Sequence, residues 1–231
     1  MNTLKENTVE IWLAHLNNFY HRLDELRTVL TEPEIKKAER FHFAKHQKRY
    51  AVSQSILRIL LGQYSKQNPK NIELAKGKYG KPYLENSNIK FNVSHSNEYA
   101  IYAFTLTDEL GVDLEYWRVR NHLDGIIDSN FSELEQRLYH QLPHELKVAG
   151  FYQGWTCNEA FIKAIGMGLS FPLKDFSVEM DPRKNVRLLE AKPQVSIDVD
   201  WCLHKLACPA GYSAALAAKG RKVEILVHDF V

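Results

Sequence analysis

Apolar and polar positions follow two different periods in the first third of the chain, one typical of strands and one of helices. Residues 8–16 form a short β-prone run in which the alternation is imperfect. Residues 31–64 carry apolar side chains at helical spacing, among them Leu57 and Leu61. Thr31 followed by two acids and a proline is typical of a helix start. We therefore predict one strand followed by a long helical segment with interruptions.

Three β-prone runs come next, at residues 89–93, 99–106 and 111–117. Short polar stretches separate them, and this spacing predicts a meander of antiparallel strands. The segment 76–84, which precedes the runs, contains two glycines and three lysines and is typical of a loop.

The remaining half of the chain repeats the order of a helical region followed by strands. Residues 132–142 and 145–166 have helical patterns, and the second helix should end at Gly166. Strand-like runs follow at residues 176–180, 186–190, 199–207, 212–219 and 223–230. The two halves share this order of elements but show no residue-by-residue sequence repeat. The pattern therefore predicts an α+β fold of two similar lobes, divided near residue 106.

Composition excludes several classes of protein. The 231 residues are 45% hydrophobic and 25% charged, with a net charge of +2, and this balance lacks the basic excess of a general nucleic-acid binder. The three cysteines include no CxxC pair, which fits a reducing compartment and gives no zinc site. The first ten residues lack the apolar stretch of a signal peptide, and no apolar run approaches membrane-spanning length. We expect a soluble, cytoplasmic protein.

The stretch GVDLEYW sets Asp113 and Glu115 one residue apart in a run that is otherwise apolar. Side chains alternate across a strand, so the two carboxylates share one face. They repel each other unless water solvates them or a cation lies between them. An exposed strand face is the ordinary explanation, and a metal site is the alternative.

A helical stripe supplies a third acid. Trp155, Glu159 and Lys163 follow each other at four-residue spacing. A glutamate and a lysine at this spacing form a common surface pair, but the aromatic side chain in the stripe favours a packed face. Combined with Asp113 and Glu115, Glu159 would complete three oxygen ligands suited to Mg²⁺, with a lysine beside them for a phosphate.

The first half of the chain offers possible phosphate-binding groups. Ser94 and His95 end a predicted strand, Lys81 lies in the glycine-rich loop, and Arg49 lies on the basic helix. Considered alone, each has an ordinary explanation as a turn, loop or surface residue.

Taken in order, four segments resemble one family, the Sfp-type 4′-phosphopantetheinyl transferases. They are YGKP at 79–82, FNVSHS at 91–96, GVDLE at 111–115 and WTCNEAFIKAIGMGLSFPL at 155–173. The resemblance implies two pseudo-symmetric lobes, each an antiparallel sheet packed with helices, with coenzyme A in a cleft between them. Residues 1–106 would form the lobe that holds the adenosine end of coenzyme A. Residues 107–231 would form the metal-binding and catalytic lobe, with a short C-terminal tail.

The resemblance also implies a reaction and residue roles. The 4′-phosphopantetheine group of coenzyme A would pass to a serine of an apo acyl, aryl or peptidyl carrier protein, releasing adenosine 3′,5′-bisphosphate. Asp113, Glu115 and Glu159 would hold Mg²⁺, Glu159 would also be the base for the serine, and Lys163 would contact the reacting phosphate. The residues implied for the coenzyme A nucleotide are Arg49, Lys81, Pro82, Ser94 and His95.

The same resemblance implies a monomer whose partners are coenzyme A and carrier protein domains, without nucleic acid or membrane. One position departs from the family, which commonly has a lysine before the helix glutamate where this chain has Asn158. An amide cannot supply a positive charge, so we expect retained activity with weaker coenzyme A binding.

Two other functions remain compatible with these residues. A non-catalytic relative could bind coenzyme A or a carrier protein without turnover, as Asn158 allows. An unrelated magnesium enzyme could cleave a nucleotide pyrophosphate, and it would then act on other nucleotides without a protein acceptor.

Overall fold

The computed structural model describes residues 3–106, 108–118, 123–192, 201–220 and 223–231. The chain forms two compact units. The first unit comprises Met1–Lys76, Pro82–Thr107 and Glu224–Val231, and the second comprises Gly77–Lys81 and Asp108–Val223. Each unit is described by itself.

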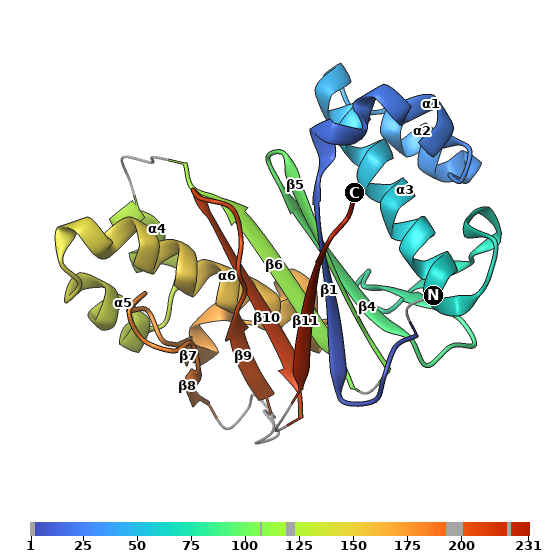
Figure 1. Ribbon diagram of the computed structural model, residues 1–231. Helices are drawn as coiled ribbons and strands as arrows, with labels where there is room; N and C mark the ends of the chain where they lie inside the picture. Colours follow the sequence, from blue (N-terminus) through green and yellow to red (C-terminus); the bar gives the residue numbers. More distant parts are fainter. Residues whose placement is uncertain (1–2, 107, 119–122, 193–200, 221–222) are drawn as a thin grey trace. The chain divides into compact units, whose positions relative to one another are not determined.

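The first unit is built on a four-stranded sheet with the order β11-β1-β5-β4 (Figure 1). Its strands are β1 (Thr8–His15), β4 (Lys90–Ser96), β5 (Tyr99–Thr105) and β11 (Glu224–Asp229). The pairs β1–β5 and β4–β5 are antiparallel, whereas β11 runs parallel to β1. The C-terminal strand therefore completes the sheet that the first strand of the chain begins.

Helices cover this sheet, and β2 and β3 form a separate two-stranded hairpin. The helical elements are η1 (Leu16–Arg22), α1 (Leu23–Arg27), α2 (Glu32–Glu39), α3 (Ala44–Ser65) and η2 (Pro69–Asn71). The predicted apolar positions Leu57 and Leu61 of α3 are buried in the core of this unit. The segment predicted as a loop at residues 76–84 instead contributes to a hairpin of β2 (Leu74–Lys76) and β3 (Pro82–Leu84).

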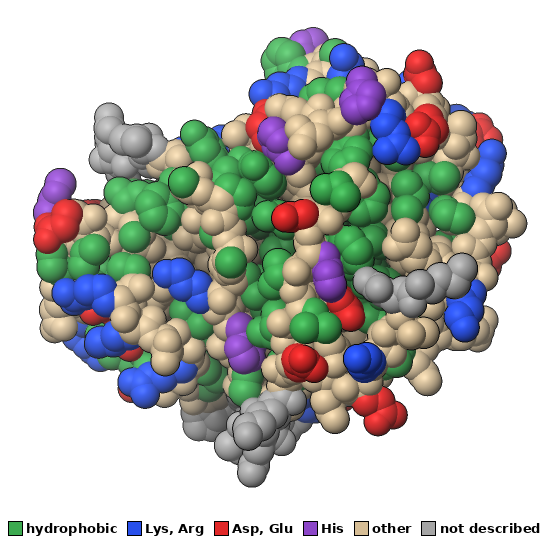
Figure 2. Space-filling view, in the orientation of Figure 1, with side chains coloured by type: hydrophobic (Ala, Val, Ile, Leu, Met, Phe, Trp, Pro, Cys, Tyr) green, Lys and Arg blue, Asp and Glu red, His purple; other side chains and the backbone are tan. Residues whose placement is uncertain are grey.

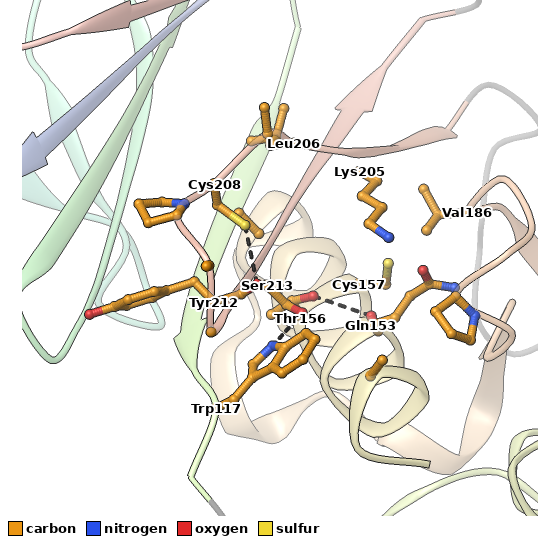
Figure 3. Close-up of a pocket in the computed structure, with 17 residues that line it drawn as sticks. Trp117, Gln153, Thr156, Cys157, Val186, Lys205, Leu206, Cys208, Tyr212 and Ser213 are labelled. Atoms are coloured by element: carbon orange, nitrogen blue, oxygen red, sulfur yellow. Dashed lines mark hydrogen bonds between the residues drawn. The ribbon is translucent and has the colours of Figure 1, made fainter. Parts of the chain in front are cut away.

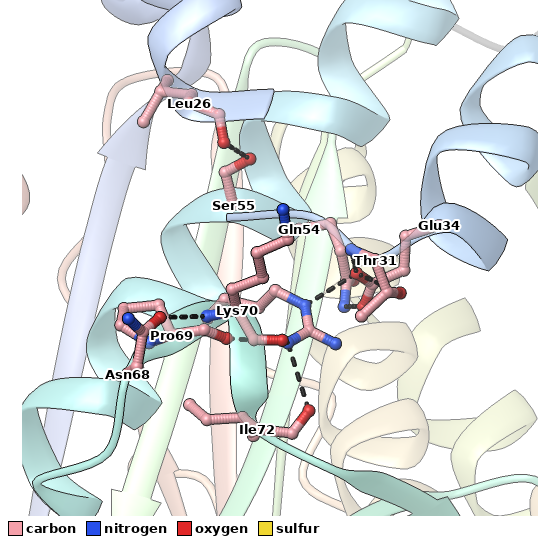
Figure 4. Close-up of polar contacts among 10 residues, drawn as sticks. Leu26, Thr31, Glu34, Gln54, Ser55, Asn68, Pro69, Lys70 and Ile72 are labelled. Carbon is pink, nitrogen blue, oxygen red and sulfur yellow. Dashed lines mark hydrogen bonds and ion pairs between the residues drawn. The ribbon is translucent and has the colours of Figure 1, made fainter. Parts of the chain in front are cut away.

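A buried ion pair fixes α2 against α3. Glu34 closes the capping box that Thr31 opens at the start of α2. Its carboxylate also accepts a hydrogen bond from Nε of Arg58 at 2.6 Å, and the Arg58 side chain is only 3% exposed (Figure 4). The same guanidinium donates to the carbonyls of Pro69 and Ile72 at 2.7 and 3.1 Å. One buried cation thus joins the start of α2, the middle of α3 and the loop after α3.

The second unit has a three-stranded antiparallel sheet with the order β6-β10-β9. The strands are β6 (Leu110–Tyr116), β9 (Trp201–Lys205) and β10 (Tyr212–Lys219), and β7 (Phe176–Val178) pairs with β8 (Leu188–Ala191) in a separate hairpin. The helical elements are α4 (Leu123–Asn130), α5 (Glu133–His140), η3 (His144–Leu146), α6 (Lys147–Ile165), η4 (Gly168–Ser170) and η5 (Leu173–Asp175). Helix α6 packs on β6 and β10, and Gly166 ends it with a left-handed backbone.

The predicted α+β class, with antiparallel sheets packed with helices, is confirmed. The predicted meander of three strands is wrong in its third member. β4 and β5 form the expected hairpin, but β6 pairs with β10, about a hundred residues further along the chain. Spacing along the chain reports turns, whereas this pairing is non-local. Among the described residues, no helix is long and apolar enough to cross a membrane.

Small residues let α6 approach the sheet closely. Gly111 on β6 faces α6, and a Cβ built there would lie 2.2 Å from the carbonyl oxygen of Ala160 and 2.3 Å from the backbone nitrogen of Ala164. The neighbouring strand presents Ala217 and Ala215 opposite Gly111 and Asp113. Helix and strand therefore meet almost backbone to backbone, which sets the spacing of the side chains that follow Gly111.

We predict that Gly111→Ala lowers the free energy of unfolding by about 3 kcal/mol, because backbone atoms of α6 cannot move aside as a flexible side chain would. Equilibrium urea denaturation measures this change. Gly125→Ala is the matched control, since a Cβ at this exposed position of α4 meets nothing within 4 Å and should stabilise the helix. Equal stability of the Gly111 variant and the parent protein would contradict the close contact.

Candidate active site

Asp113 and Glu115 project from β6 on the face that meets α6. They alternate with Val112 and Leu114, which are fully buried. The sequence left open an ordinary exposed strand face, but Asp113 is only 3% exposed. Burying a carboxylate is unfavourable without a charged or hydrogen-bonding partner, so the partner of Asp113 matters.

Lys163 on α6 provides that partner. Its Nζ atom lies 2.6 Å from Oδ1 of Asp113 and also donates to the carbonyl of Val112 at 3.3 Å. The lysine is 28% exposed and the Asp113 side chain 4%. The last turn of α6 is thus linked to the middle of β6 by a short, partly buried ion pair.

Glu159 lies one helical turn before Lys163 on the same stripe of α6. Burial raises the pKa of Glu159, the negative charge of Asp113 raises it further, Lys163 lowers it, and Glu115 raises it again. Such charges act through space over several ångströms, so the four groups lie in one region of the second unit. The structure therefore brings together Asp113, Glu115, Glu159 and Lys163, which we call the acid cluster.

The donor set of the acid cluster fits a hard divalent cation. The negative charges of Asp113 and Glu115 add to burial in raising the pKa of Glu159, so the three carboxylates repel each other, and Mg²⁺ prefers oxygen ligands of this kind. In the part of the chain that the structure describes, however, no three acidic, histidine or cysteine side chains are arranged as a ready metal site. The ammonium of Lys163 occupies one oxygen of Asp113 in this arrangement.

The nucleotide-binding candidates of the first unit gather near the end of β4. Arg49 on α3 donates to Oδ1 of Asn97 at 2.9 Å and to the carboxylate of Glu98, both in the turn between β4 and β5. Ser94, which is buried, and His95, which is exposed, lie on β4 just before this turn. Nε of Arg49 is buried and has no hydrogen-bond partner among the described residues, so an anion at this place would satisfy it.

The other two candidates belong to the hairpin of β2 and β3. Pro82 is the first residue of β3 and pairs with Lys76 of β2. Lys81 precedes it and donates to Glu109, Leu110 and Ala164, all in the second unit. Lys81 therefore belongs to the unit that contains the acid cluster, whereas Pro82 belongs to the first unit with Arg49, Ser94 and His95.

Asn158, the position that departs from the family, points away from the acid cluster. It is 2% exposed, and its Nδ2 atom donates to Oε1 of Glu135 at 3.0 Å. Glu135 also accepts the backbone N–H groups of Ser132 and Val178 at 2.9 and 3.1 Å. The sequence pattern indicates a lost charge in the site at Asn158, whereas the structure shows a contact with Glu135, which the pattern does not single out. The available signal was the Ser-x-x-Glu capping box at 132–135, whose glutamate can bond beyond its own helix.

A cavity of about 370 Å³ lies on another flank of α6 (Figure 3). Gln153, Cys157, Lys205 and Ser213 line it with Trp117, whose Nε1 atom donates to Oγ of Ser213 at 2.9 Å. Burial raises the pKa of the Cys157 thiol to about 12, which disfavours the reactive thiolate. None of the candidate site residues is among those that line this cavity.

Glu135 predicts a specific dependence of stability on pH. Burial raises its pKa from 4.5 to about 7, against the lowering effect of the three N–H donors. The folded chain then holds this proton more tightly than the unfolded chain, so the stabilising contribution is complete below about pH 4.5 and is lost as the pH rises to about 7.

We therefore expect Glu135→Gln to flatten the decrease of the unfolding free energy between pH 5 and pH 7, as measured by urea denaturation at several pH values. The exposed Glu133→Gln on the same helix is the control and should retain the slope of the parent protein. An unchanged slope in the Glu135 variant would rule out this titration.

Comparison with known proteins identifies the family. Residues 109–217 match the model of the 4′-phosphopantetheinyl transferase superfamily, and residues 15–107 match the model of the 4′-phosphopantetheinyl transferase N-terminal region. The 4′-phosphopantetheinyl transferase HetI of Nostoc sp. is 32% identical over 94% of this chain and 90% of its own length. The 4′-phosphopantetheinyl transferase ffp of Bacillus subtilis is 31% identical over 72% of this chain and 75% of its own length.

The chain also resembles the putative 4′-phosphopantetheinyl transferase slr0495 of Synechocystis sp., with 31% identity over 84% of this chain and 78% of the relative. The acid cluster lies within the region matched by the superfamily model, and Arg49, Ser94 and His95 lie within the region matched by the N-terminal model. The chain belongs to the 4′-phosphopantetheinyl transferase superfamily.

Proposed function

We propose that this enzyme transfers the 4′-phosphopantetheine group of coenzyme A to a serine of an apo acyl, aryl or peptidyl carrier protein in a magnesium-dependent reaction. The observation that carries the proposal is the acid cluster, in which three carboxylates and a lysine meet where β6 and α6 pack. Such a cluster suits phosphoryl-group chemistry, since it combines oxygen ligands for a cation with a fixed positive charge.

The proposed reaction is a displacement at phosphorus. The serine oxygen forms a bond to the phosphorus that carries the pantetheine arm, and the bond from that phosphorus to the bridging oxygen breaks. Adenosine 3′,5′-bisphosphate leaves with the bridging oxygen. The serine proton passes to Glu159, directly or through one water, because a serine hydroxyl is a poor nucleophile without a base.

The environment of Glu159 suits this role. Burial and the negative charges of Asp113 and Glu115 raise the pKa of Glu159 before a cation binds, so its carboxylate accepts a proton more readily than an exposed one. Asp113, Glu115 and Glu159 would hold Mg²⁺, which would supply charge stabilisation at the pyrophosphate oxygens. Lys163 would add a contact to the reacting phosphate from its position beside Asp113.

The remaining assignments are part of the same proposal. Arg49, Lys81, Pro82, Ser94 and His95 would hold the nucleotide of coenzyme A, Lys81 through its backbone, and the buried Nε of Arg49 favours an anion near the end of β4. We further propose a cytoplasmic monomer whose carrier partners serve fatty-acid or secondary-metabolite synthesis. The alternative is a relative that binds coenzyme A or a carrier without turnover. The position of Asn158 outside the acid cluster removes the sequence-based reason for that alternative.

The direct test is the intact mass of an apo carrier protein after incubation with the enzyme, coenzyme A and Mg²⁺. We expect a gain of about 340 Da, the mass of one phosphopantetheine group, and no gain in a parallel sample with chelator. Binding of coenzyme A without any mass gain on fatty-acid and peptidyl carriers would favour the non-catalytic alternative. Turnover of other nucleotides without a carrier would favour a pyrophosphate-cleaving enzyme.

Glu159→Gln tests the role of the proposed base while preserving the shape of the side chain. We expect kcat to fall by at least about 100-fold, because general-base catalysis contributes this much or more. The rate of carrier modification measures the effect, and Glu145→Gln, an exposed change just before α6, is the control. Substantial residual activity in the Glu159 variant would contradict its assignment.

A further inference from the structure

The tip of the β2–β3 hairpin, residues 77–81, groups with the second unit although both of its strands belong to the first. The tip is a tight turn in which the N–H of Gly77 donates to the carbonyl of Lys81 and the N–H of Gly80 donates to the carbonyl of Gly77, both at 2.9 Å. Gly80 has a φ of 88°, which favours glycine. Among the described residues, Lys81 of this turn donates hydrogen bonds to Glu109, Leu110 and Ala164 of the second unit.

Three acceptors surround the ammonium of Lys81. Its Nζ atom lies 2.6 Å from Oε2 of Glu109 and 3.0 Å from each of the carbonyl oxygens of Leu110 and Ala164. The lysine side chain is 19% exposed. An ammonium has three N–H donors, and each of these three acceptors lies within hydrogen-bond distance of it. A lysine held in this way is a poor choice for direct capture of a phosphate.

The acceptors belong to the two elements that carry the acid cluster. Ala164 is next to Lys163 in the last turn of α6, and Leu110 is the residue before Gly111 at the start of β6. Helix C-termini expose unpaired carbonyl groups, and a lysine there both satisfies a carbonyl and favours the helix dipole. Lys81 therefore joins the end of α6 to the beginning of β6, next to the close approach of the two backbones at Gly111.

The segment after α6 fits against the same turn. A Cβ at Gly166 would lie 3.3 Å from Cδ of Lys81, and Gly166 also has a φ of 78°. A Cβ at Gly168 would lie 3.7 Å from the carbonyl oxygen of Tyr79. The turn 77–81 thus contacts the catalytic helix through its lysine and packs beside the glycines that follow it.

We propose that Lys81 is a positioning residue that holds α6 against β6, so that Glu159 and Lys163 face Asp113 and Glu115. This inference rests on the proposed function and refines it, because Lys81 acts on the reaction through the acid cluster. Its ammonium does not bind the coenzyme A phosphates, and the contribution of the turn to the nucleotide comes from its backbone and from Pro82.

The test compares Lys81→Met with Lys76→Met, which removes the same charge from an exposed position on β2 of the same hairpin. We expect Lys81→Met to lower kcat by about tenfold to 100-fold, since small misplacements of catalytic groups cost this much. Its Kd for adenosine 3′,5′-bisphosphate, measured by calorimetry, should stay within about threefold of the parent value. A tenfold weaker bisphosphate affinity with retained kcat, or no change in either quantity, overturns the proposal.

Glu109→Gln distinguishes a positioning role of Lys81 from a phosphate-binding role, because the two roles predict different effects on kcat and on bisphosphate affinity. If Lys81 is a positioning residue, loss of the Glu109 charge weakens its attachment and lowers kcat, and the double variant is no worse than Lys81→Met alone. If Lys81 binds phosphate, loss of the competing carboxylate tightens bisphosphate binding instead, and that result overturns the proposal.

Hydrogen exchange tests the attachment of the turn to α6 without any measurement of enzyme activity. If the parent enzyme modifies no carrier, the proposed function fails, but the attachment of the turn can still be measured in the full chain. Lys81→Met should accelerate exchange of the Gly166 amide, which donates to the carbonyl of Ile162 at the end of α6, and Lys76→Met should not. Equal exchange in both variants overturns the positioning role.

Discussion

The near contact of the β6 and α6 backbones at Gly111 is the constraint on which the acid cluster depends. No side chain separates the two elements at this point, and the strand beside β6 presents alanines to the helix. Asp113 and Glu115 follow Gly111 on the same face of β6. The close packing at Gly111 therefore brings their side chains near Glu159 and Lys163 on α6. The glycine at the start of GVDLE is therefore as much a part of the site as the acids, although it carries no chemistry.

Each unit uses the same device to hold a short helix against its long central helix. A capping-box glutamate at the third position of α2 or α5 satisfies its own helix start and then accepts a hydrogen bond from α3 or α6. In the first unit, Glu34 pairs with Arg58, and in the second Glu135 pairs with Asn158. The repeated order of elements in the sequence thus corresponds to a repeated polar contact, with a charged donor in one unit and a neutral donor in the other. At Glu135, where no cation of the described residues contributes, burial outweighs the hydrogen bonds and raises the pKa. At Glu34 burial also raises the pKa, but hydrogen bonds from Arg58 and Thr31 and the charge of Arg58 lower it by more.

The sequence predicted what local patterns can encode. Helical spacing marked α3 and α6, β-prone runs marked most strands, and alternation placed Asp113 and Glu115 on one face. It did not show that β6 leaves its sequence neighbours for β10, or that the C-terminal strand joins β1, because such pairings depend on contacts between distant segments. For the same reason the sequence does not reveal the Lys163–Asp113 ion pair or the contacts of Lys81. Lys163 and Asp113 are 50 positions apart in the chain, and Lys81 and Ala164 are 83 positions apart.

Asn158 shows how a departure from a family pattern acquires meaning from the fold. Adjacent residues on a helix point about 100° apart, so the residue before Glu159 need not face the acid cluster. In this chain it faces α5, where its amide binds a buried carboxylate that three N–H groups surround. Asn158 therefore attaches α6 to α5. On another face α6 packs against β6 at Gly111, and Lys81 binds the last turn of the helix. A helix restrained on three sides can keep Glu159 and Lys163 in place when the residue before Glu159 carries no charge, provided that this residue still reaches Glu135.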